Sequence, residues 1–138
     1  MKITGLNGRE YHLDLKKYSK QRAKCSFYHK VCRELLRDVF AGYHVYEEVK
    51  LPGTVNPSKK SALYLDFLIP NAIIAVEVHG QQHFEYVPYF HKTKAGFLQA
   101  KARDRAKAEW CELNGLTLVE LRWDESVGYW RDKIERSR

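Results

Sequence analysis

The sequence has 138 residues, 44% hydrophobic and 30% charged, which fits one globular domain with a single core. This composition excludes an intrinsically disordered chain, and the longest apolar runs are far shorter than the roughly 20 residues of a membrane-spanning helix. The N-terminus shows no apolar export signal, and three cysteines without CxxC spacing indicate free thiols, so we expect a cytoplasmic protein without membrane contact.

Positive charge is in excess and unevenly distributed: 24 Lys and Arg stand against 17 Asp and Glu. Residues 16–24 (KKYSKQRAK) carry five positive charges and no negative one, and residues 92–107 are rich in Lys and Arg around one acid, Asp104. Such clusters are typical of phosphate-binding surfaces, although a merely solvated basic surface is the alternative. The residues expected to bind nucleic acid are Lys16, Lys17, Lys20, Arg22, Lys92, Lys94, Lys101 and Lys107.

The first half of the chain predicts a hairpin, a basic linker and a helix. Residues 2–15 predict a small hairpin that turns at Asn7-Gly8, a dipeptide favoured in type I′ turns. Residues 26–40 place apolar side chains at helical spacing, with Ser26 as the N-cap.

The remaining elements predict a mixed sheet covered by helices. Strands are expected at residues 44–51, 61–69, 72–79 and 116–123, a helix from about Lys94 to Asn114 that ends at Gly115, and a last helix from Asp124. After the hairpin the order is αβββαβ, which predicts a mixed α/β fold. We expect a single domain over 1–138, made of the hairpin and linker (1–24), a core (25–123) and a C-terminal helix (124–138).

Two acids lie on the predicted hairpin formed by the second and third core strands. With a turn at Asn71-Ala72, Asp66 lies directly opposite Glu77; with a turn at Pro70-Asn71, the two are diagonal neighbours. Either register keeps both carboxylates on one face, with Cβ atoms about 5–8 Å apart. Like charges this close repel unless a cation or a proton lies between them, and a divalent ion with oxygen ligands at about 2.1 Å fits the gap.

Two histidines follow these acids. His79 lies two residues after Glu77 and therefore projects from the same face, and His83 follows where the strand has given way to a loop. A cation between two acids beside a proton-transferring imidazole suits phosphodiester hydrolysis. The alternative is structural: Asp66 stabilises the hairpin, Glu77 pairs with an arginine, and the histidines lie on the surface.

The motifs LDF, EVHGQQH and RDRAK, the last on a helix before the final strand, together resemble the PD-(D/E)xK, restriction-endonuclease-like nucleases. Residues 26–123 are most similar to the branch of the very-short-patch-repair endonuclease and the EDxHD homing endonucleases, including small phage-encoded members. The resemblance implies a restriction-endonuclease-like core and a nuclease that uses Mg²⁺ or Mn²⁺.

The resemblance also assigns roles by position. It implies that Asp66 and Glu77 bind the metal, together with the main-chain carbonyl of Val78, and that His79 replaces the usual lysine. His83 matches the histidine and Asp104 the last aspartate of EDxHD, which makes Asp104 a further candidate ligand.

The sequence departs from the family pattern at two positions. Leu65 stands where proline usually precedes the aspartate. The glutamate of the first helix would fall near Tyr28 or His29, neither of which is an acid. Three acids are alternatives for this role, namely Glu34 on the helix and Glu47 or Glu48 on the first core strand.

We therefore expect a Mg²⁺- or Mn²⁺-dependent DNA endonuclease with Asp66, Glu77, His79, His83, Asp104 and Glu34 as catalytic candidates. A nicking or branch-cutting enzyme of recombination or repair suits so small a chain, and a homodimer would provide two active sites for cutting both strands. Two alternatives are a nuclease-like fold that binds nucleic acid without cleaving it, which the missing helix acid favours, and a nuclease directed to RNA.

Overall fold

A computed structural model describes residues 1–55, 61–81 and 93–138. His83 and Lys92, expected respectively in the site and on the nucleic-acid surface, lie outside the described residues. The elements are β1 (Lys2–Thr4), β2 (Glu10–His12), α1 (Phe27–Val39), β3 (Tyr46–Leu51), β4 (Leu63–Ile69), the 3₁₀ turn η1 (Pro70–Ala72), β5 (Ile74–His79), α3 (Lys94–Leu113), β6 (Thr117–Arg122) and α4 (Val127–Arg136). The predicted mixed α/β fold, with an αβββαβ order after a hairpin, is confirmed.

Four strands form the central sheet in the order β3-β4-β5-β6. The first three are antiparallel, and β6 runs parallel to β5 after the crossover through α3. The basic linker runs along the outer edge of β3, where the Lys20 N–H donates to Glu47 O at 2.9 Å and the Lys50 N–H donates to Tyr18 O at 2.8 Å. This linker therefore satisfies backbone groups that an edge strand would otherwise expose.

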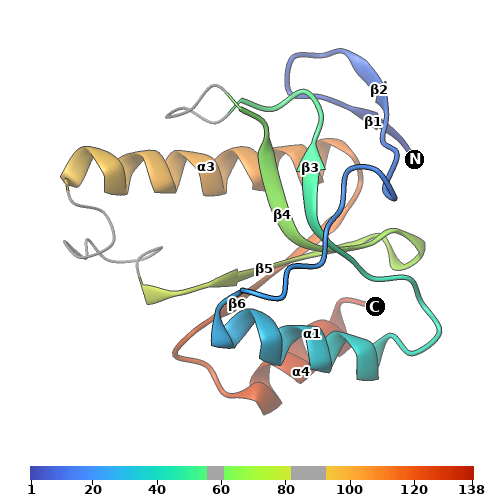
Figure 1. Cartoon of the computed structure of the whole chain (residues 1–138), viewed down its shortest axis with the longest axis vertical. Helices are drawn as coiled ribbons and strands as arrows, with labels where there is room; N and C mark the ends of the chain where they lie inside the picture. Colours follow the sequence, from blue (N-terminus) through green and yellow to red (C-terminus); the bar gives the residue numbers. More distant parts are fainter. Residues whose placement is uncertain (56–60, 82–92) are drawn as a thin grey trace.

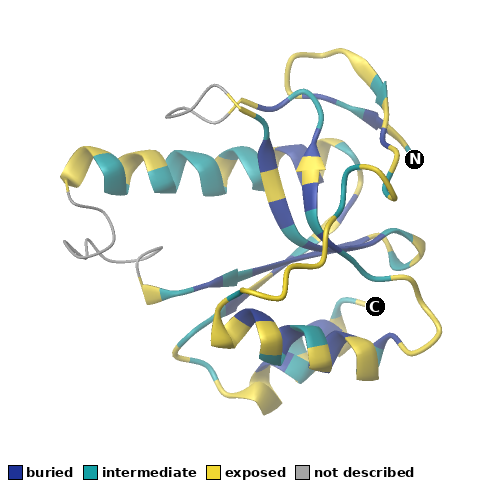
Figure 2. Ribbon diagram, viewed as in Figure 1, coloured by how far each residue is buried: buried dark blue, intermediate teal, exposed yellow. Residues whose placement is uncertain are grey.

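Helices cover both faces of the sheet, α3 on one and the α1–α4 pair on the other (Figure 1). Beside α1 and α4 the buried core includes Phe40, Phe67, Val76 and Trp130. A second buried cluster lies beside α3. The largest side chain of this second cluster, Trp110, is fully buried and donates its indole N–H to Pro52 O at 3.1 Å. The inner faces of the helices and strands are dark in Figure 2. Two apolar layers therefore fix the sheet between the helices.

Helix boundaries follow their capping residues. Ser26 Oγ accepts the His29 N–H at 3.1 Å, as predicted, and Gly115 follows α3 with φ +69°. The last helix begins at Val127, not at Asp124, because Ser126 is its N-cap and accepts the Tyr129 N–H. The hairpin turn is longer than the predicted type I′ turn, because the last paired residues are Thr4 and Glu10, and only Gly8 of the Asn7-Gly8 pair has a positive φ.

Two facing residues interrupt the β3–β4 pair. The register pairs Glu47 with Phe67 and Val49 with Leu65, and Glu48 and Asp66 lie between these pairs. Glu48 has φ +48°, a left-handed conformation that is unusual for glutamate. The strands change faces here: Phe67 belongs to the cluster beside α1, whereas Leu65 belongs to the cluster beside α3. The distortion brings Glu48 and Asp66 to the boundary between the two layers.

Candidate metal centre

Asp66 and Glu77 lie where β4 and β5 separate. The paired residues end at Phe67–Val76, so the same register places Asp66 opposite Glu77, the first of the two predicted arrangements. Side chains replace the ladder beyond this pair: the Asp66 N–H donates to Glu77 Oε2 at 3.0 Å, and the Val78 N–H donates to Asp66 Oδ2 at 2.8 Å. Each carboxylate is therefore held by the backbone of the opposite strand.

A histidine and a second glutamate meet Asp66 from other elements. One ligand atom each from His29 of α1, Glu48 of β3 and Asp66 of β4 all lie within 4.8 Å of one another. This is the one group of at least three such residues found within the described parts of the chain. Because an imidazole nitrogen and carboxylate oxygens are ordinary ligands of divalent ions, the donor set fits a metal.

The His29 ring is held by two neighbours, Glu47 and Phe67. Its Nε2 lies 2.9 Å from Glu47 Oε1, and the ring stacks on Phe67 with centroids 4.4 Å apart. Arg33 donates two charge-assisted hydrogen bonds to the same glutamate, from Nε to Oε2 and from Nη2 to Oε1, both at 2.8 Å. Burial would raise the pKa of Glu47, but the hydrogen bonds from Arg33 and His29 outweigh it and lower the pKa. Glu47 is therefore a carboxylate that orients His29.

Lys107 of α3 neutralises part of this acidic group. Its Nζ lies 2.7 Å from Glu77 Oε1, an oxygen that is buried and has no partner in hydrogen-bonding geometry. The contact is thus an ion pair, not an aligned hydrogen bond. Burial opposes the ammonium form, but the charges of Glu77 and Asp66 prevail and raise the pKa of Lys107. Lys107 remains an ammonium at neutral pH.

Asp66, unlike Lys107, favours its uncharged form. Burial is the largest cause that raises the pKa of this carboxyl well above its usual value, and the charge of Glu77 adds to it. Lys107 and the Val78 N–H act in the other direction but do not compensate. Without a cation, the neighbouring acids therefore favour a proton on Asp66.

His79 and Asp104 are not among the clustered ligand atoms. His79 is buried, and its Nε2 lies 3.3 Å from Glu120 Oε1 of β6. The contact with His79 is the main cause that lowers the pKa of Glu120, while the charge of Asp104 acts in the opposite direction. The group within 4.8 Å does not include Asp104, and its predicted role as a ligand stays a prediction. The N–H of Val78 points to β4, and its carbonyl points to the same side, since both groups of a strand residue face one neighbour.

Two predicted roles are wrong. Glu34 lies on the exposed side of α1, where its side chain is 73% exposed and pairs with Arg37, so it does not supply the missing helix acid. Lys107 is not a surface contact for phosphates, because its side chain is only 17% exposed and is engaged by Glu77. Other predicted basic residues do lie at the surface, exposed or partly exposed: Lys16, Lys17, Lys20, Arg22, Lys94 and Lys101.

Sequence reasoning did not bring His29 together with Glu48 and Asp66 as a ligand, and it missed Glu120 as a partner of His79. The family pattern points to the position of His29 but expects an acid there, although histidine is itself a common ligand. Among the three alternative acids, Glu48 is the one whose carboxylate joins the group, while Glu47 is engaged by Arg33. The signal for Glu48 is weak, because nothing in the sequence announces a left-handed glutamate within a strand.

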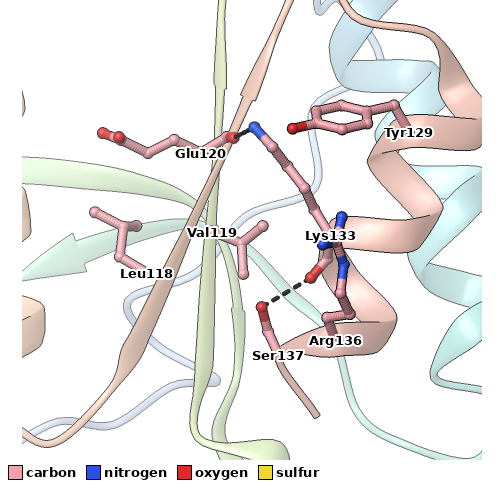
Figure 3. Close-up of a pocket in the computed structure, with 7 residues that line it drawn as sticks. All are labelled: Leu118, Val119, Glu120, Tyr129, Lys133, Arg136 and Ser137. Atoms are coloured by element: carbon pink, nitrogen blue, oxygen red, sulfur yellow. Dashed lines mark hydrogen bonds between the residues drawn. The ribbon is translucent and has the colours of Figure 1, made fainter.

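Glu120 also separates the site from a surface pocket of about 420 Å³ (Figure 3). Tyr129, Lys133 and Arg136 of α4 line this pocket. Lys133 Nζ donates to the main-chain oxygen of Glu120 at 2.9 Å, whereas the Glu120 carboxylate extends away from the pocket in Figure 3 and pairs with His79. The pocket is therefore not part of the candidate metal centre.

The chain is similar to proteins of iridescent viruses. It is 34% identical over 73 residues to "Uncharacterized protein 307L" of Invertebrate iridescent virus 6, a match that covers 53% of this chain and 37% of that protein. It is 36% identical over 77 residues to "Uncharacterized protein 094L" of Frog virus 3 (isolate Goorha), covering 55% of this chain and 50% of that protein. "Uncharacterized protein 033L" of Invertebrate iridescent virus 3 is 32% identical over 66 residues, 48% of this chain and 34% of that protein.

The chain thus spans half or less of the length of these curated relatives. No family model matches it, and no solved structure matches it. The resemblance to the PD-(D/E)xK nucleases stays a prediction.

In the described part of the chain, no helix is both long enough and apolar enough to cross a bilayer. The cysteines Cys25, Cys32 and Cys111 are free thiols, as predicted.

Proposed function

We propose that this protein is a metal-dependent endonuclease that hydrolyses phosphodiester bonds in DNA. The observation that carries the proposal is the group of His29, Glu48 and Asp66 at the point where β4 and β5 separate, with Glu77 accepting the Asp66 N–H beside it. Glu48, Asp66 and Glu77 thus place three carboxylates in a partly buried region. A purely structural role would not require so many like charges at one place.

His29, Glu48 and Asp66 would hold the ion, with Glu77 beside Asp66. When bound, a divalent ion supplies an activated water and neutralises negative charge that develops on the phosphate. Asp66 and Glu77 are positioned for this by the opposite strand's backbone, and Glu47 with Arg33 fixes the orientation of His29.

Lys107 takes the role of the usual lysine, whose place the resemblance gave to His79. Its ammonium lies 2.7 Å from Glu77 Oε1, close to the acids, whereas His79 pairs with Glu120 on the next strand. Because Lys107 stays protonated, it can stabilise a developing oxyanion or donate a proton, and it is not the general base.

The basic linker provides the contact with the DNA backbone. It passes along β3 through the backbone pairs Lys20–Glu47 and Tyr18–Lys50, which lie on either side of Glu48. Exposed Lys16, Lys17 and Arg22 belong to the same segment. Phosphates bound there would run past the acidic group, as an endonuclease requires.

The proposal is tested by incubating plasmid and branched DNA with Mn²⁺ or Mg²⁺ and comparing wild type with Asp66→Asn. The variant keeps an oxygen that can accept the Val78 N–H but loses the charge, so we expect cleavage to fall about 100-fold or more.

Glu34→Gln is the matched control, since it removes a carboxylate from an exposed position of α1 and should cleave like wild type. Equal cleavage by wild type and Asp66→Asn would refute the proposed site. DNA binding without cleavage in any arm would favour the binding-only alternative, and cleavage of RNA alone would favour the RNA-directed one.

A further inference from the structure

We propose that the cation site is a mixed nitrogen–oxygen site built around His29, and that it selects a first-row transition metal ion such as Mn²⁺ over Mg²⁺. The inference rests on the metal-binding part of the proposed function and does not depend on the hydrolytic reaction. It replaces the expectation of a site made of oxygen ligands alone.

The donor set gives the chemical reason. The ligand atoms of His29, Glu48 and Asp66 lie within 4.8 Å of one another, so a single ion can reach a nitrogen and two oxygens. Mg²⁺ prefers oxygen ligands and keeps several of its waters, whereas an imidazole nitrogen increases affinity along the series from Mn²⁺ to Cu²⁺. A histidine in this position therefore favours the transition ion.

His29 is oriented as a ligand before any ion binds. The Glu47 carboxylate accepts a hydrogen bond from His29 Nε2 at 2.9 Å, so Nδ1 is the ring nitrogen that keeps a lone pair for an ion. Arg33 holds that carboxylate with two hydrogen bonds, and stacking on Phe67 fixes the plane of the ring. A carboxylate on the second nitrogen is the arrangement that supports metal-ligating histidines in proteins.

The balance of charge around Asp66 also favours a divalent ion. Glu77 is 2% exposed, and its Oε1 lies 2.7 Å from Lys107 Nζ in an ion pair without aligned hydrogen-bond geometry. When ionised, Glu48, Asp66 and Glu77 carry three negative charges, and Lys107 offsets one of them. The remaining two match a divalent ion, and a buried acidic group of this kind is costly without one.

The test measures metal binding and not cleavage. Mn²⁺ is titrated into the full-length protein and followed by electron paramagnetic resonance, with Mg²⁺ and then Co²⁺ added as competitors. Electron spin-echo modulation of the bound Mn²⁺ shows whether a ¹⁴N nucleus is coordinated. His29→Glu converts the site to oxygen ligands, and Glu47→Gln removes the orienting charge while the site ligands remain.

We expect one Mn²⁺ per chain with ¹⁴N modulation, displaced by Co²⁺ but not by an equal concentration of Mg²⁺. His29→Glu should abolish the modulation and lower the ratio of Mn²⁺ to Mg²⁺ affinity about tenfold or more, and Glu47→Gln should weaken Mn²⁺ binding about 10–100-fold.

Bound Mn²⁺ without ¹⁴N modulation, or equal competition by Mg²⁺ in wild type, would overturn the inference and leave the proposed nuclease standing. No Mn²⁺ binding at all would overturn both. Since the modulation is measured on wild type, the test does not depend on the His29→Glu variant folding correctly.

Discussion

Asp66 connects the parts of the site, because it contacts three other elements at once. Its carboxylate accepts the Val78 N–H of β5, its own N–H donates to Glu77, and its carboxylate lies close to His29 of α1 and Glu48 of β3. A negative charge on Asp66 lies beside the carboxylates of Glu48 and Glu77, and either a proton or a cation can relieve the repulsion. Protonation of Asp66 and cation binding therefore compete for the same oxygens.

This competition predicts how the stability of the metal-free protein depends on pH. The pKa of Asp66 is raised by burial first and by Glu77 second, so the folded state binds this proton more tightly than the unfolded chain does. Stability should therefore increase as the pH falls from neutrality towards about 4.5, below which lowered-pKa acids such as Glu47 begin to oppose it.

Urea unfolding between pH 8 and pH 5 with a chelator present measures this effect. Asp66→Asn should flatten the rise, while Glu34→Gln should keep it. An identical pH dependence in wild type and Asp66→Asn would show that another group is responsible.

Single residues are predicted unevenly by the sequence. Asp66 and Glu77 can be paired because strand alternation fixes which side chains share a face. His29 and Glu48 cannot be joined to them from the sequence, since their approach depends on how α1 packs on β4 and on a left-handed residue in β3. The sequence places Lys107 at the surface because it ends a stretch rich in Lys and Arg, and only the packing of α3 on the sheet turns it towards Glu77.

At the scale of elements, α3 is the crossover helix that connects β5 to β6 and lets the two strands run parallel. Asn114 at its C-terminus also joins the N-terminal hairpin: the Thr4 N–H donates to its Oδ1 at 2.7 Å and its Nδ2 donates to Thr4 O at 2.9 Å. The elements themselves are predictable from periodicity and capping residues, whereas this long-range contact between residues 4 and 114 is not.

The turn after α3 gives a prediction with a matched control of opposite sign. Gly115 has φ +69°, so Gly115→Ala should destabilise the protein by about 1 kcal/mol. Gly128 is the second residue of α4, and an added Cβ would meet Ser126 Oγ only at 3.9 Å, so Gly128→Ala should stabilise the protein by about 0.5 kcal/mol. Chemical denaturation measures both, and a destabilising Gly128→Ala would contradict this account of α4.

At the scale of the whole molecule, the acidic group lies within a protein of net charge +7. The linker between β2 and α1 carries exposed positive charges along the edge of β3, next to the strand that supplies Glu48. Its basic composition is evident in the sequence, but its position beside the site is not, because linkers carry no periodic signal that fixes where they pack.

Salt dependence should show whether the linker binds phosphates. Replacing its basic residues by glutamine should reduce the slope of log affinity against log salt for duplex DNA by up to about 0.9 for each phosphate that the variant no longer neutralises. The residues to replace are Lys16, Lys17, Lys20 and Arg22. A control that removes the same amount of charge uses exposed residues of the hairpin and the C-terminus: Lys2, Arg9, Arg136 and Arg138. Fluorescence anisotropy measures both slopes, and equal reductions would mean that net charge alone governs binding.

A crystal structure of the protein soaked in Mn²⁺ tests the central claim most directly. We expect an anomalous difference peak within ligand distance, about 2.0–2.3 Å, of His29, Glu48 and Asp66, and the disappearance of that peak in Asp66→Asn. A peak at another place, or none at a Mn²⁺ concentration that supports DNA cleavage, would contradict it.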